Sequence, residues 1–105
     1  MPTFERTDAF KRDWQRELSR EDRARARVAI FEHFIPDLTG IEEGKQEAFR
    51  RSLKVVPMRD HEGVWEMRWE PDDGRATFHY GDEQVAGKRH VVWRRIGTHA
   101  IYADP

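Results

Sequence analysis

The chain of 105 residues is long enough for one domain with a single hydrophobic core and too short for two. Hydrophobic and charged residues each make up 37% of it, and the net charge of -1 lacks the basic excess usual in nucleic-acid-binding proteins. The absence of cysteine excludes disulfides, thiolate zinc sites and cysteine nucleophiles. The chain has neither an apolar run of about eighteen residues nor a signal-like amino terminus, so we expect one cytoplasmic domain over residues 1–105.

The amino-terminal residues predict a strand followed by a helix. Residues 3–7 fit a short first strand. Asp8 is a candidate N-cap, and Phe10, Trp14 and Leu18 follow at a spacing of four, which places them on one helix face. An apolar stripe of this kind predicts an amphipathic helix.

A second helix is predicted directly after the first. Ser19 is its candidate N-cap, and Asp22 stands three residues later, close to a capping box. Its apolar stripe, at helical spacing, consists of Ala24, Val28, Phe31, Ile35 and Leu38. Pro36 would remove one intrahelical hydrogen bond and clash with the preceding turn, so we expect a kink or a helix boundary at about Ile35.

Three later runs alternate apolar with polar side chains, which is typical of half-buried strands. They span residues 63–69, 74–80 and 89–102. A turn over 71–74 and a longer polar loop over 81–87 separate them, and such short connections make neighbouring strands antiparallel. The sequence therefore predicts an α+β fold with two helices on one sheet face. Residues 40–56, between the helices and the strands, predict a loop with one short helical turn and a weakly alternating end.

Alternation assigns the side chains of these strands to two faces. Trp65, Met67 and Trp69 share one face, while Glu66 and Arg68 share the other. The same rule places Ala76, Phe78 and Tyr80 opposite Arg75, Thr77 and His79. The first face suits packing against helices. The second carries Arg, Glu and His, which can hold a phosphate and move a proton, so we expect the function there.

Cleavage of a phosphodiester by the neighbouring ribose hydroxyl fits such a face. It needs a base for the 2′-OH proton, cations for the charge growing on the phosphate, and an acid for the departing 5′ oxygen. Arg75 and Arg95 are the candidate cations, because guanidinium is permanently charged and presents a planar fork to phosphate. Glu66, His99 and Tyr102 are candidates for the base and the acid. The same charges could instead be ordinary cross-strand pairs on a solvated face.

A local basic patch is predicted on a nearly neutral chain. Residues 88–95 carry four cations and no acid. We predict that Lys88, Arg89, Arg94 and Arg68 contact RNA. No metal site or cofactor is predicted, because the histidines lack a helical metal-binding spacing and the chain has no Gly-rich phosphate loop, Gly-x-Ser-x-Gly elbow or dinucleotide fingerprint.

An ordered set of short motifs spans nearly the whole chain. After the two predicted helices come LKVVPM at 53–58, GVWEMR at 63–68, GRATF at 74–78 and RIGTH at 95–99. In this order the motifs resemble the RelE/ParE superfamily of toxins from type II toxin–antitoxin systems. The likeness is greatest to actinobacterial members of the RelE-like branch.

This resemblance implies a microbial RNase-like fold, with two helices against a curved, mainly antiparallel sheet of about four strands. Members of the RelE type enter the ribosomal A site and cut the exposed mRNA without a metal, and a cognate antitoxin protein neutralises them. The implied partners are therefore the antitoxin, the ribosome and mRNA, with no membrane and no small-molecule cofactor.

The resemblance also carries roles over to single residues. Arg75 matches the strand arginine that contacts the scissile phosphate, and His99 lies where members place a carboxyl-terminal His or Arg serving as acid or base. Arg95 matches a recurrent cationic position. Glu66 and Tyr102 match positions that are catalytic in only some members.

Two departures from the family keep other functions open. Many members continue Gly-Thr-His with Asp, where this chain has Ala100, and ribosome-dependent members are usually basic. One alternative is a non-catalytic toxin of the same fold, as in the ParE branch that poisons DNA gyrase; the set of Arg75, Arg95 and His99 argues against it. Another is a degenerate member kept for protein interaction. A register slip of one residue would exchange Arg94 for Arg95 on the working face.

Overall fold

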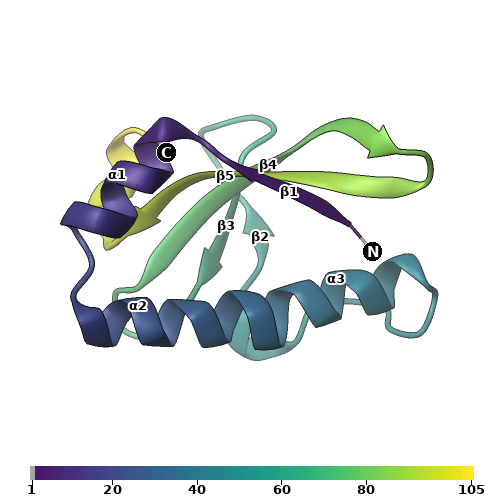
Figure 1. The fold of residues 1–105 in the computed structure, drawn as a ribbon, viewed down its shortest axis with the longest axis horizontal. Helices are drawn as coiled ribbons and strands as arrows, with labels where there is room; N and C mark the ends of the chain where they lie inside the picture. Colours follow the sequence, from purple (N-terminus) through teal and green to yellow (C-terminus); the bar gives the residue numbers. More distant parts are fainter. Residues whose placement is uncertain (1) are drawn as a thin grey trace.

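A computed structural model describes residues 2–105 and places five strands in one sheet, as Figure 1 shows. The strands are β1 (Thr3–Arg6), β2 (Val56–Pro57), β3 (Trp65–Arg68), β4 (Arg75–Val85) and β5 (Lys88–Gly97), in the spatial order β1-β5-β4-β3-β2. All pairs are antiparallel except β1 with β5. The predicted α+β class is confirmed, with five strands where about four were expected. Within the described residues, no helix is long and apolar enough to cross a membrane.

Helix α1 (Asp8–Arg16) begins one residue earlier than predicted. Thr7, not Asp8, is the N-cap, because its extended backbone lets Oγ1 accept a hydrogen bond of 3.1 Å from Phe10 N. The Thr7 hydroxyl also donates to Arg94 O at 2.7 Å, which fastens the start of the helix to β5. Phe10 is buried as predicted, and Leu18 is buried beyond the end of the helix.

The second helix is one continuous rod that runs along one face of the sheet (Figure 1). It consists of α2 (Arg20–Arg27), a π-helical segment η1 (Val28–Phe34) and α3 (Ile35–Glu42). Ser19 caps it as predicted, with Oγ accepting from Asp22 N at 3.0 Å. The boundary expected at Ile35 is where the π segment ends, but the chain continues as a helix through Pro36. The wider π turn, in which Ile35 N bonds to Ile30 O, relieves the crowding that a proline causes in an ordinary helix.

Of the predicted apolar stripe of this helix, Leu38 is buried and Ile35 is partly buried against the core, while Ala24, Val28 and Phe31 are exposed. The core contains Ala26, Ile30, Phe34 and Leu38, each four positions after the last, together with Ala29. A constant spacing of four drifts around a helix of 3.6 residues per turn, and the π turn compensates for the drift. As a result Val28 and Phe31 point away from the core, with 43% and 65% of their surface exposed.

The sheet meets this helix through an aromatic cluster. The ring centroids of Phe34, Phe78 and Trp93 lie 4.9–5.3 Å apart in all three pairs. Met67 and Ala76 lie in the core, as the alternation predicted, but Arg75 and Thr77, which were predicted on the opposite face, are buried as well.

The predicted loop over 81–87 is wrong, because β4 continues to Val85 and pairs with Lys88. Only Ala86 and Gly87 form the turn, and its second residue has a positive φ of 77°, which glycine adopts without strain. Residues 81–84 belong to the end of β4, where both faces of the hairpin are exposed. Such a strand has no alternation of apolar and polar residues, so its sequence resembles that of a loop.

An ion pair between the buried Asp37 and the exposed Arg50 orders the crossing between the helix and the sheet. The carboxylate of Asp37 accepts bonds of 2.9 Å from Arg50 Nε, Nη2 and backbone N. Side-chain hydrogen bonding to Arg50 is the main reason that the pKa of Asp37 falls to about 2. A 3₁₀ turn, η2 (Arg51–Leu53), follows and places Leu53 in the core.

Candidate functional site

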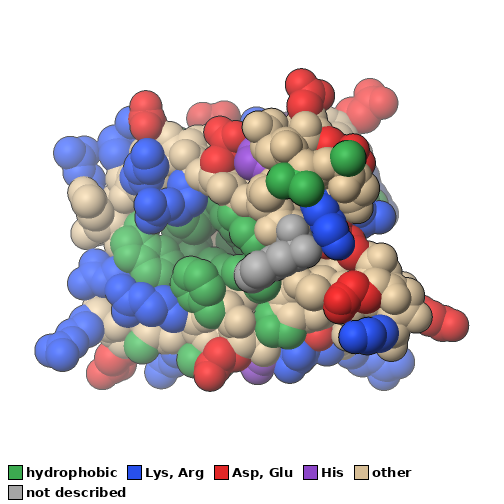
Figure 2. All heavy atoms as spheres, turned by 45° about the vertical axis from the view of Figure 1, so that its right-hand side comes forward, with side chains coloured by type: hydrophobic (Ala, Val, Ile, Leu, Met, Phe, Trp, Pro, Cys, Tyr) green, Lys and Arg blue, Asp and Glu red, His purple; other side chains and the backbone are tan. Residues whose placement is uncertain are grey.

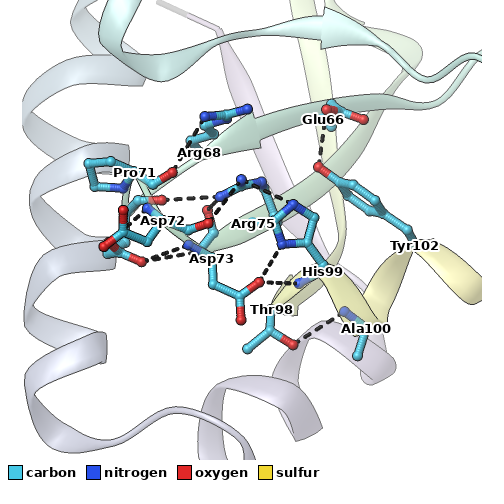
Figure 3. Close-up of polar contacts among 12 residues, drawn as sticks. Glu66, Arg68, Pro71, Asp72, Asp73, Arg75, Thr98, His99, Ala100 and Tyr102 are labelled. Carbon is cyan, nitrogen blue, oxygen red and sulfur yellow. Dashed lines mark hydrogen bonds and ion pairs between the residues drawn. The ribbon is translucent and has the colours of Figure 1, made fainter.

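Arg75 lies at the start of β4 and is almost fully enclosed, with 2% of its surface exposed. Its Nη1 donates to Gly74 O at 2.9 Å and to Glu70 O at 3.2 Å, and Nη2 lies 3.4 Å from Asp72 O. The turn over 70–74 therefore wraps around the guanidinium (Figure 3). A Cβ at Gly74 would lie 2.5 Å from Glu70 Cβ, so glycine permits this close turn.

Glu70 holds the same turn from its other side. Its carboxylate accepts bonds from the backbone N atoms of Asp72, Asp73 and Gly74 at 2.9, 2.9 and 3.2 Å. These bonds, led by the one from Asp72, lower the pKa of Glu70 because they favour its charged form. The turn thus presents Asp73 in a fixed position.

His99 begins the carboxyl-terminal 3₁₀ segment η3 (His99–Ala103) and lies between Asp73 and Arg75. Its Nδ1 contacts Asp73 Oδ1, its backbone N donates to the same oxygen at 3.1 Å, and its Nε2 lies 3.1 Å from Arg75 Nη2. Guanidinium can only donate, so Nε2 is the acceptor and Nδ1 carries the proton that is donated to Asp73. This side-chain bond is the main reason that the pKa of Asp73 is lowered.

Asp73 is the functional residue that sequence reasoning missed. It supplies the carboxylate that the resemblance places after His99, where the chain has Ala100. The two partners stand 26 positions apart and meet because Arg75 pairs with Gly97 across β4 and β5. The sequence offered one signal for this role, namely that Asp73 lies in the predicted turn just before Arg75.

Tyr102 and Glu66 complete the group beside His99 (Figure 3). The Tyr102 hydroxyl donates to Glu66 Oε1 at 3.0 Å, and the Tyr102 and His99 rings meet edge to face with centroids 5.4 Å apart. Burial, followed by the Glu66 charge, raises the pKa of Tyr102. Of the five predicted catalytic residues, the structure therefore brings together Arg75, His99, Glu66 and Tyr102.

Arg95 lies apart from this group, in an ion pair with α1. Its Nε and Nη2 bond to the Asp13 carboxylate at 2.6 and 3.1 Å, and its Nη1 bonds to Asp104 O at 2.9 Å. Asp13 also accepts from Ile96 N at 3.1 Å. The side-chain hydrogen bonds between Asp13 and Arg95 are the main reason that the pKa of Arg95 is raised. The geometry thus gives Arg95 a role in joining α1, β5 and the last residues.

The pairing of β4 with β5 shifts by one residue between Thr77 and Phe78. The predicted alternative, in which only one of Arg94 and Arg95 lies on the working face, therefore does not arise. Two residues of β5 stand between the buried Trp93 and Ile96, so both arginines leave the core side. Arg94 Nη1 lies 3.0 Å from His79 Nδ1, while Nε and Nη2 bond to the Pro105 backbone oxygen at 3.2 Å. Burial is the main reason that the pKa of His79 is lowered.

The remaining predicted RNA-binding residues divide between two places. Lys88 and Arg89 lie at the hairpin end of β5, roughly 30 Å along the strand from His99. Arg89 lies over the Tyr80 ring, 5.0 Å from its centroid, and its backbone N bonds to Glu42 at 2.6 Å. Arg68 is the cross-strand neighbour of Arg75 and is partly exposed beside the site.

Within residues 2–105, no group of three or more His, Asp or Glu side chains could hold a metal ion. Comparisons with known protein families, curated proteins and solved structures find no match for this chain. The functional argument therefore depends on the arrangement of the residues around His99.

Proposed function

We propose that the protein is a toxin of the RelE type, an endoribonuclease that cuts mRNA on the ribosome through attack of the 2′-OH on the scissile phosphate. The observation that carries this proposal is the contact of Asp73 and Arg75 with the two ring nitrogens of His99. Nδ1 is protonated and donates to the Asp73 carboxylate, while the lone pair of Nε2 accepts from Arg75. When a substrate 2′-OH takes the place of Arg75 at Nε2, this tautomer is the one that a general base needs.

In this scheme His99 meets the substrate; 53% of its side chain is exposed, as is 54% of that of its partner Asp73. Asp73 orients the ring and stabilises the charge that the imidazole gains when it takes the 2′-OH proton. Arg75 positions the ring from inside the fold. Arg68, which reaches the surface next to Arg75, is the cation that meets the phosphate first.

Arg75 can also contact the phosphate directly if η3 moves aside. Its Nε is buried and has no hydrogen-bond partner within residues 2–105, so one N–H of the guanidinium is free for a phosphate oxygen. That contact would stabilise the charge of the transition state, while the bonds to Glu70 O and Gly74 O keep the guanidinium in place.

Tyr102 is the proposed acid for the departing 5′ oxygen. Its hydroxyl is protonated at neutral pH, lies beside His99 and donates to Glu66 Oε1, so in this scheme it turns from Glu66 to the 5′ oxygen. Its raised pKa makes Tyr102 a weaker acid than a free tyrosine. The reaction in this scheme uses protein side chains and the ribose hydroxyl, with no cofactor. The proposed partners are the ribosome, mRNA and a cognate antitoxin in the cytoplasm.

Induced expression in a bacterial host tests the proposal, with growth followed and the 5′ ends of cellular mRNA mapped. We expect wild type to arrest growth with in-frame cuts, and His99→Ala to lose both, since a proton-transfer group contributes about 10²- to 10⁴-fold in rate. Arg75→Ala should also lose both.

The other outcomes contradict the proposal in distinct ways. Growth arrest without cuts would indicate a non-catalytic toxin of the same fold, of the kind that poisons DNA gyrase. Unimpaired growth with soluble, folded protein would indicate a degenerate protein-interaction domain.

A further inference from the structure

A second surface, distant in sequence from the His99 site, is a groove between α1, the edge strand β1 and the long helix. It encloses about 440 Å³. Its apolar lining consists of Phe4, Phe10, Trp14, Ile30, Phe31 and Ile35. Figure 2 shows this hydrophobic hollow with Lys and Arg side chains around its rim. No residue that lines it belongs to the group around His99.

The π segment creates the exposed part of this surface. The helix buries one apolar face through Ile30 and Phe34, and the same segment turns Phe31 outward, where 65% of it is exposed. Single π turns are frequent at functional sites, and a large exposed aromatic beside an apolar hollow is typical of a binding surface. The predicted apolar stripe is therefore divided: Phe31 and Ile35 line the groove, Leu38 lies in the core, and Ala24 and Val28 are exposed elsewhere.

The charges around the groove favour an acidic partner. Arg6 and Arg27 line it, and neither forms an ion pair within residues 2–105. The Arg27 guanidinium lies over the Trp14 ring, 5.3 Å from its centroid, which leaves its N–H groups available. The acidic residue that lines the groove is Glu5, and its Oε1 is paired with His90 Nε2 at 2.7 Å.

We infer that this groove binds an acidic amphipathic segment of a partner protein. Apolar side chains of that segment would cover Phe31 and Trp14, and its carboxylates would pair with Arg6 and Arg27. The inference does not depend on the proposed nuclease activity, because binding here requires none of the residues around His99.

Selection from a displayed library of random 16-residue peptides on the purified wild-type protein provides the test. We expect the enriched peptides to combine Leu, Ile or Phe with Asp or Glu. Phe31→Ser should weaken their binding about thirtyfold, as loss of a central aromatic anchor does. Arg6→Glu together with Arg27→Glu should reverse the preference from acidic to basic peptides.

Two controls separate this effect from misfolding and from the His99 site. Val85→Ser removes an apolar side chain that is 52% exposed at the far hairpin, and it should leave binding unchanged. His99→Ala should bind like wild type. Circular dichroism and thermal unfolding check that every variant is folded.

Three results would overturn the inference. One is enrichment of basic or uncharged peptides on wild type. Another is binding that Phe31→Ser and Val85→Ser affect equally. The third is sedimentation showing that wild type self-associates while Phe31→Ser is a monomer, because the occupant would then be a second copy of the chain.

Discussion

The His99 site and the groove beside α1 differ in how many of their polar and apolar side chains have partners within the protein. At the site, the ring nitrogens of His99 and most donors of Arg75 have partners within the chain. In the groove, Phe31 is exposed and Arg6 and Arg27 form no ion pair within the described residues. This difference is what we expect if, as proposed, the site is organised in advance for chemistry and the groove is completed by another molecule.

The largest expected effect separates the two faces of the long helix. Phe34→Ala should lower the free energy of unfolding by about 3 to 5 kcal/mol, because it opens a cavity among Phe78 and Trp93. Phe31→Ser, three residues earlier on the exposed face, should change it by no more than about 0.5 kcal/mol. Urea unfolding of both variants measures the difference. Equal destabilisation would mean that Phe31 belongs to the core.

The next effect concerns Arg95, which the sequence predicted, together with Arg75, as a candidate catalytic cation. Arg95→Ala should lower the free energy of unfolding by about 3 kcal/mol, because it leaves the Asp13 carboxylate buried without its ion-pair partner. Arg51→Ala, an exposed arginine outside every ion pair of the described residues, is the matched control. If Arg95→Ala kept full stability and lost nuclease activity instead, Arg95 would belong to the catalytic group.

A smaller effect appears in acid and involves neither region. The folded-state pKa of Asp37 is about 2 against an ordinary 3.8, so its pairing with Arg50 contributes about 2 kcal/mol above pH 4. This contribution is lost as the pH falls from about 4 towards 2. In that range Asp37 is protonated first in the unfolded chain, and it is protonated in the folded protein only near pH 2. Asp37→Asn should remove that part of the pH dependence in urea titrations. An unchanged pH profile would contradict the assignment.

The smallest effect on stability is expected at the site itself. Asp73→Asn replaces an exposed carboxylate by an amide of the same shape, so urea unfolding should match that of wild type. Asp73→Asn should reduce cleavage at neutral pH by about tenfold or more, because the carboxylate that orients the His99 ring is lost. Asp72→Asn is the control, and equal loss in both variants would contradict the orienting role of Asp73.

The outlines of the fold were accessible from the sequence where a pattern was both regular and half buried. Met67 and Ala76 lie in the core on the face that the apolar alternation of the sequence predicted. The phase of the long helix was not accessible, because the π turn around Ile30 changes the period within the element. The hairpin end near Val85 was missed because both of its faces are exposed.

The sequence predicted most residues of the site individually, but it did not predict how they are arranged. Arg75, His99, Glu66 and Tyr102 were named from residue type and position, and the structure brings them together. Asp73 meets His99 only through strand register. Arg95 meets Asp13 across 82 positions, and local patterns contain no information about such pairs.

Cleavage by the purified protein of an mRNA held on translating ribosomes is the most direct test of the central claim, that His99 performs proton transfer in a ribonuclease. Wild type should cut the ribosome-bound message, and His99→Ala, equally folded, should cut it at least about 100-fold more slowly. Cutting by both proteins at the same rate, or by neither, would contradict the account.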